Sequence, residues 1–133
     1  MPNAEPPRLF DRALLAERLR RALLADAPGA DFLLRRAAEE LADRLSFIRR
    51  EFATAADVGT PGPHAAEVLA ARGGGFTLQL APLALAAGRG PYARAVGDLE
   101  ALPLAAERCD LVVSLLALHH VNDLPGALIQ LRR

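Results

Sequence analysis

The chain has 133 residues, of which 52% are apolar and 24% are charged, so it has enough apolar residues for one folded domain and is not a disordered chain. Sixteen basic residues balance sixteen acidic ones, and the sequence pI is near 6.8. Proteins that grip the nucleic-acid backbone through bulk charge are normally far more basic, so no nucleic-acid partner is expected. The single cysteine excludes an internal disulfide and a cysteine-based zinc site. No apolar run is long enough for a transmembrane segment.

The N-terminal part of the chain predicts two helices. Good helix formers follow a Pro-Pro pair over residues 8–25, and a Pro-Gly pair then breaks the chain. Asp31 is the expected N-cap of a second helix that runs to about residue 50. One face of this helix is apolar and consists of Leu34, Ala37, Ala38, Leu41, Leu45 and Ile48. We expect residues 1–50 to form an N-terminal helical cap near the carboxyl edge of the sheet described next.

From residue 51 onward, short apolar strands alternate with helices. The expected strands are residues 53–58, 76–80, 92–96 and 109–116, and the expected helical segments are 64–72, 82–87 and 124–133. This alternation predicts an α/β fold with a doubly wound parallel sheet of about four strands over residues 51–133. The segment from Cys109 to Leu116 is apolar on both faces, as a central parallel strand should be, and we expect it beside the strand that ends at Asp57. Cys109 is interpreted as a core residue and not as a nucleophile.

A glycine-containing turn joins the first expected strand to the next helix. Gly59 and Gly62 lie where a ligand approaches the backbone in doubly wound sheets, and the helix N-terminus beyond them offers free N–H groups. Pro61 and Pro63 depart from a glycine-rich loop, because each removes a donor and restricts φ. An ordinary strand-to-helix turn is the alternative interpretation of this segment.

Two further polar features follow expected strands. Asp98 lies after the third strand, where a carboxylate can accept a hydrogen bond from an exocyclic amine, and a helix cap or solvated turn is the alternative. His119 and His120 follow the fourth strand and are candidates for an acid–base or substrate-contact role, with packed structural histidines as the alternative. Adjacent residues of a strand point apart, so the pair is not expected to share a metal, and no metal site is predicted.

Taken in order, these segments resemble the class I S-adenosylmethionine-dependent methyltransferases, in particular the methyltransferase type 11 domain. The most specific piece is CDLVVSLLALHHVNDLPGALIQLRR, which is similar to the fourth strand and following helix of the group that contains the mitochondrial complex I assembly-factor methyltransferase-like proteins. The segments LFDR and DFLLRRAAEELADRLSFIRREF are also similar to that group. The resemblance implies a Rossmann-like fold. It ends before the remaining strands of the family, so the chain is expected to be a C-terminally truncated member.

The resemblance also implies roles for individual residues. Asp57 and Gly59 match the start of the first cofactor motif, and Gly62 stands in for a displaced glycine. Gln79 takes the place of the acid that holds the ribose hydroxyls of the cofactor, which predicts weakened binding. The remaining matches are Asp98 with its neighbour Leu99 at the adenine, Leu115 and Leu116 at the methionine end, and His119 and His120 as weak catalytic candidates.

The function implied by this resemblance is that of an S-adenosylmethionine-dependent methyltransferase or of its cofactor-binding portion, with an unknown acceptor. Two alternatives are a respiratory complex I assembly factor of the arginine-hydroxylating type and an inactive truncated member. The expected partners are the small-molecule cofactor and a protein substrate or respiratory-complex subunit. The N-terminus lacks the apolar core of a signal peptide, which favours a cytoplasmic protein, with a peripheral place on the inner membrane as the alternative. We expect little turnover by this chain alone.

Overall fold

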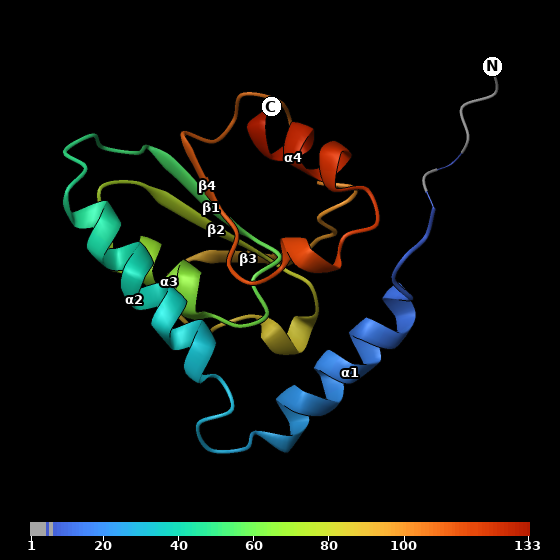
Figure 1. The fold of residues 1–133 in the computed structure, drawn as a ribbon. Helices are drawn as coiled ribbons and strands as arrows, with labels where there is room; N and C mark the ends of the chain where they lie inside the picture. The colour runs from blue at the N-terminus through green and yellow to red at the C-terminus, as the bar shows by residue number, and fades with distance from the viewer. Residues whose placement is uncertain (1–4, 6) are drawn as a thin grey trace.

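The computed structural model describes residue 5 and residues 7–133, and it has the predicted α/β architecture (Figure 1). Four parallel strands form one sheet in the order β3-β2-β1-β4. The strands are β1 (Thr54–Val58), β2 (Phe76–Ala81), β3 (Ala93–Val96) and β4 (Leu111–Val113). The helices are α1 (Arg12–Ala25), α2 (Phe32–Ser46), α3 (His64–Arg72) and α4 (Leu124–Arg132), with single 3-10 turns η1 (Ala84–Ala86) and η2 (Leu118–His120).

Two apolar clusters hold helices to opposite faces of the sheet, so the fold has three layers (Figure 1). Side chains of a strand alternate between faces, and Ala55 of β1 belongs to the cluster under α2 and α3, whereas Ala56 and Val58 belong to the other. The second cluster also receives Leu131 of α4 and the partly buried Cys109, which is consistent with a core role for that cysteine. The doubly wound arrangement predicted from the sequence is therefore confirmed.

The two N-terminal helices occupy different places. Helix α1 begins at Arg12 and not at residue 8, because the Asp11 carboxylate caps it by accepting from the Leu14 N–H at 3.0 Å. It lies at the carboxyl edge of the sheet, as expected. Helix α2 instead packs on α3, and its Leu45 joins the core, so the expectation that both helices lie at the carboxyl edge is wrong for α2. The division at residue 50 stays a prediction.

Helix α2 ends four residues earlier than the sequence suggested, and Asp31 does not cap it. The Arg72 Nη2 atom donates to the carbonyls of Ile48 (2.7 Å) and Arg50 (2.8 Å), which holds residues 48–50 outside the helix. The Asp31 carboxylate occupies the N-cap position but makes no cap bond, because it pairs with Arg35 and His64, each at 2.9 Å. The His64 contact joins the beginnings of α2 and α3.

The expected fourth strand is present beside β1 but is only three residues long. Its register pairs Ala55, Ala56 and Asp57 of β1 with Leu111, Val112 and Val113. Beyond Val113 the chain leaves the sheet. Among the described residues β4 is an edge strand and not a central one.

Candidate functional site

A cleft at the carboxyl edge of the sheet collects half of the predicted site residues, and we name it the carboxyl-edge cleft. Its volume is about 770 Å³. Helix α1 forms one wall, and the segments that follow the four strands form the others. Of the predicted site residues, Gly59, Asp98, Leu99, Leu116 and His120 line it. Ligands of open parallel sheets bind at this edge, which makes the cleft the candidate functional site.

The first glycine after β1 is required by the geometry of the cleft. Gly59 has a φ of +76°, and a Cβ at this position would lie 2.5 Å from Leu99 Cδ1. Only glycine adopts such a φ without cost, so both the backbone and the packing exclude a larger residue. Gly62 does not line the cleft, and its carbonyl accepts a hydrogen bond from Gln79 on the protein side. Of these two glycines, only Gly59 brings the backbone to the surface of the cleft.

A buried hydrogen-bond network joins the ends of β1 and β4. The Thr60 hydroxyl donates to Asp57 Oδ1 at 2.5 Å, and its oxygen accepts from the Leu115 N–H at 3.0 Å. Asp57 and Thr60 are both fully buried. Thr60 was not among the predicted site residues, although a small hydroxyl residue directly after the turn glycine is a signal that could have singled it out. This network fixes Leu115 behind the cleft and positions Leu116 at its surface.

The acid of this network has an unusual protonation equilibrium. Burial raises the pKa of Asp57 to about 7, while the hydrogen bond from the Thr60 hydroxyl and the backbone amide of Ala66 oppose the rise. Its Oδ2 atom is buried and has no hydrogen-bond partner among the described residues. Neither Asp57 nor Thr60 lines the cleft, and the pair is connected to the segment after β4 by the hydrogen bond from the Leu115 N–H to Thr60.

Gln79 is another predicted site residue that the structure keeps away from the cleft. Its side chain is fully buried. The amide nitrogen donates to the carbonyls of Gly62 and Ala86, both at 3.2 Å, and the amide oxygen accepts from the Gly88 N–H at 2.9 Å. These bonds occupy its polar atoms, and the cleft wall at the end of β2 consists of Pro82 and Leu83 instead.

Asp98 faces the cleft after β3 and is already engaged by the protein. Its Oδ1 atom accepts from Arg12 Nη2 at 2.5 Å and from the Glu100 N–H at 2.8 Å. The hydrogen bond from the Glu100 N–H is the kind of local turn contact that was the alternative interpretation of Asp98. Asp98 therefore lines the cleft and also stabilises the turn after β3. Burial would raise the pKa of Asp98, but the Arg12 guanidinium and the Glu100 amide outweigh it and lower the pKa below its usual range.

The segment after β4 turns sharply into the cleft. Leu116 has a φ of +52°, a conformation that is costly for a leucine and persists only where neighbouring contacts impose it. The Thr60–Leu115 hydrogen bond is such a contact on the adjacent residue. Leu116 is partly exposed at the cleft surface, whereas Leu115 packs against the core cluster under α3.

The two adjacent histidines do not point apart, because they lie on the 3-10 turn η2 and not on a strand. Their ring centroids are 3.8 Å apart, and the Phe10 ring meets His120 edge-on at 5.9 Å. Only His120 lines the cleft, and both residues are exposed. Burial and the neighbouring His119 lower the pKa of His120, which favours the neutral form of its imidazole.

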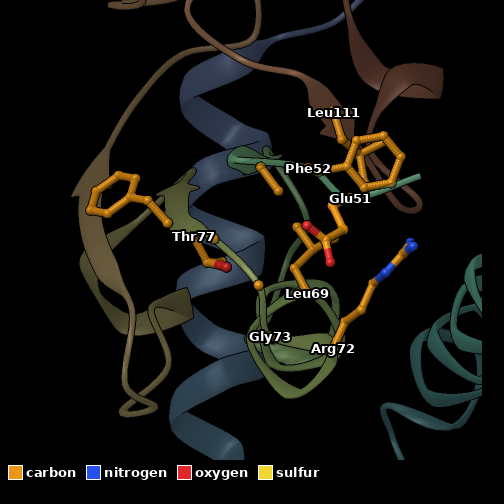
Figure 2. A pocket seen from close by; sticks show the side chains of 11 residues that line it. Glu51, Phe52, Leu69, Arg72, Gly73, Thr77 and Leu111 are labelled. Atoms are coloured by element: carbon orange, nitrogen blue, oxygen red, sulfur yellow. The ribbon is translucent and has the colours of Figure 1, made fainter. Parts of the chain in front are cut away.

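A second, smaller cavity lies at the opposite, amino edge of the sheet and has a volume of about 250 Å³ (Figure 2). Arg72 and Phe52 lie side by side along it, with the guanidinium 5.0 Å from the ring centroid. The Nη2 atom of Arg72 already donates hydrogen bonds to the carbonyls of Ile48 and Arg50, which follow α2. Since ligands of parallel sheets bind at the carboxyl ends, we assign this cavity a structural role.

Residues 56–133 match the protein family described as the methyltransferase domain. The chain belongs to this family. The matched segment of the methyltransferase domain contains every predicted site residue, from Asp57 to His120. Helix α1, which forms one wall of the cleft, lies outside the matched segment.

Three relatives are similar to more than four fifths of the chain. The protein named arginine-hydroxylase NDUFAF5, mitochondrial, of Danio rerio is 34% identical over 116 residues, which are 83% of this chain and 36% of that protein. Its counterparts in Homo sapiens and Mus musculus are each 35% identical over 129 residues, which are 92% of this chain and 37% and 38% of those proteins. The chain thus spans less than two fifths of the length of these relatives. No solved structure matches it.

Within residue 5 and residues 7–133, no three His, Cys, Asp or Glu side chains lie closely enough together to hold a metal ion. No helix in this part of the chain has the length and apolar character needed to cross a membrane.

Proposed function

We propose that the carboxyl-edge cleft binds S-adenosylmethionine and that this chain is the cofactor-binding portion of a methyltransferase. One observation carries the proposal: Gly59, Asp98, Leu99 and Leu116, which follow three different strands, line a single cleft inside a methyltransferase domain. A cleft of about 770 Å³ is within the size range of small-molecule sites.

The residues present fit the two ends of this cofactor better than its middle. Asp98 would accept from the adenine amine, and Leu116 with His120 would line the methionine end. The ribose hydroxyls would meet the apolar pair Pro82 and Leu83, because no carboxylate follows β2. One missing charge-assisted hydrogen bond lowers affinity about ten- to a hundredfold. We therefore expect weak binding.

The bound cofactor would supply a methyl group on a sulfonium, and the chain would bind and orient it. Methyl transfer needs the donor and acceptor held in line, so positioning dominates its rate. A neutral His120 beside the methionine end could accept the proton that the acceptor releases. We propose this role for His120 in preference to His119, which does not line the cleft.

Calorimetric titration with S-adenosylmethionine and S-adenosylhomocysteine tests the proposal. We expect saturable binding, and we expect Asp98→Asn to weaken it about tenfold, because the amide replaces a charged acceptor. Asp43→Asn on the exposed side of α2 is the matched control and should bind as the wild type does. Absence of binding, or equal affinity in Asp98→Asn, would overturn the proposed site.

The names of the relatives favour a second candidate, hydroxylation of an arginine in a partner protein, as in the assembly-factor alternative predicted from the sequence. Mass spectrometry of a captured partner separates the two, because one activity adds a methyl group and the other an oxygen atom to the acceptor. Release of S-adenosylhomocysteine would support the methyltransferase. Cofactor binding with neither product would support the inactive member. A cytoplasmic or membrane-peripheral location belongs to the same set of proposals.

A further inference from the structure

An ion pair connects α1 to the rim of the carboxyl-edge cleft. Arg12, in the first turn of α1, reaches Asp98 with Nη2 (2.5 Å) and Glu100 with Nε (3.3 Å). Both acids follow β3, and Asp98 is the residue proposed to contact adenine. The guanidinium therefore links a helix outside the matched family segment to the ligand-facing side of the sheet.

Helix α1 depends on few other anchors. None of its residues is buried, although Leu15 and Leu19 line the cleft. A second anchor lies just before the helix, where the Phe10 N–H donates to Asn122 Oδ1 (2.8 Å) and Asn122 Nδ2 donates to the Phe10 carbonyl (3.1 Å). Both polar anchors are at the beginning of α1, so the loss of either should loosen the cleft wall.

The geometry at Asp98 leaves room for a ligand. Arg12 and the Glu100 N–H both bind Oδ1, and none of the hydrogen bonds between described residues uses Oδ2. The ion pair thus orients the carboxylate through one oxygen and leaves the other available as an acceptor. A ligand in the cleft would touch Asp98 on one side and the apolar face of α1 on the other.

We propose that Arg12 is a positioning residue of the cofactor site, which orients Asp98 toward the adenine amine and fixes α1 as a wall of the cleft. This inference rests on the proposed function. Because the ligand contacts both elements that Arg12 joins, ligand binding and docking of α1 strengthen each other, and linkage makes the effect reciprocal.

The test uses Arg12→Gln with Arg20→Gln as its matched control. Arg20 lies on the same helix and loses the same charge, but among the residues that the structure describes it pairs only with Glu17 of α1. Hydrogen exchange of residues 12–25 is measured without ligand and with S-adenosylhomocysteine, and calorimetry gives the dissociation constant. Without ligand, we expect hydrogen exchange of α1 to be severalfold faster in Arg12→Gln and unchanged in Arg20→Gln. Adding ligand to the wild type should slow the exchange. The dissociation constant should rise about two- to fivefold in Arg12→Gln, which is the range of a partly exposed ion pair.

The outcomes separate this inference from the proposed function. If the wild type binds no ligand, the proposed function fails and the coupling fails with it. If the wild type binds and Arg12→Gln binds equally well, only the inference fails. Tighter binding by Arg12→Gln would overturn it in a different way, because Arg12 would then compete with the ligand for Asp98. Unchanged exchange of α1 in Arg12→Gln would show that the ion pair does not hold the wall.

Discussion

Replacing Thr60 by valine removes the hydroxyl group that joins β1 to the segment after β4, and it keeps the shape of the side chain. In the wild type this hydroxyl donates to Asp57 and accepts from the Leu115 N–H. The valine can do neither. Thr60→Val therefore leaves a buried carboxyl group without its donor and a backbone N–H without its acceptor.

The expected cost follows from these two losses. A hydrogen bond to a carboxylate contributes about 1.5–3 kcal/mol, and an unpaired buried N–H costs about 1–3 kcal/mol. We expect Thr60→Val to lower the free energy of unfolding by about 2.5–6 kcal/mol, against about 5–15 kcal/mol for an ordinary domain. Thr60→Ser keeps the hydroxyl and loses one methyl group, at about 1 kcal/mol.

Urea unfolding measures these free energies, and Thr77→Val is the matched control. Thr77 is buried on β2, but its side chain lines the amino-edge cavity and does not join strand ends (Figure 2). The second readout is the pKa of Asp57 by carbon NMR, which should rise above about 7 in Thr60→Val because the hydroxyl bond lowers it. A cost below about 1 kcal/mol with an unchanged Asp57 pKa would refute the network.

Two more predictions concern buried groups beside the cleft. Burial raises the pKa of Asp57 from 3.8 to about 7, so between these pH values the folded state binds a proton that the unfolded state does not. The free energy of unfolding should therefore fall as the pH rises from about 4 to 7 and level off above that. Asp57→Asn should flatten this part of the curve of unfolding free energy against pH, and an unchanged slope would contradict the prediction. Gln79→Glu, which places an acid at the position expected to hold ribose, should lower stability by about 3–6 kcal/mol in urea unfolding, because a carboxylate cannot donate to the Gly62 and Ala86 carbonyls. Tighter cofactor binding by Gln79→Glu would contradict the structure.

Local sequence signals were sufficient for the main elements. Apolar strands alternating with helices predicted the parallel sheet, and the α3 boundaries agree with the expectation because a proline-rich turn precedes the helix and three glycines follow it. Gly59 was identified from its place in a strand-to-helix turn, which is itself a local feature. Asp98 was a candidate from its place after an expected strand, whereas Leu99 and Leu116 were implied by the resemblance to the methyltransferase family, and the sheet topology brings all three to one edge.

Contacts between distant segments decided the rest. The sequence of residues 109–116 predicted a long strand. The Thr60 hydroxyl oxygen, however, accepts a hydrogen bond from the Leu115 N–H, and the chain leaves the sheet after Val113. Gln79 was assigned to the ligand by its strand position, although its side chain is used by the loop that follows β2. Neither the Thr60–Leu115 pair nor the Arg12–Asp98 pair has a sequence periodicity that could reveal it.

These same contacts determine which parts of the cleft could adapt to a ligand. The walls after β1, β2 and β4 are held by hydrogen bonds to two buried side chains, those of Thr60 and Gln79. Movement there would break hydrogen bonds in a dry environment and leave polar groups unpaired. The wall formed by α1 has no buried residue and is held by an ion pair that is partly exposed to solvent, which costs far less to break. Adjustment to a ligand should therefore occur in α1, while the sheet side of the cleft keeps its shape.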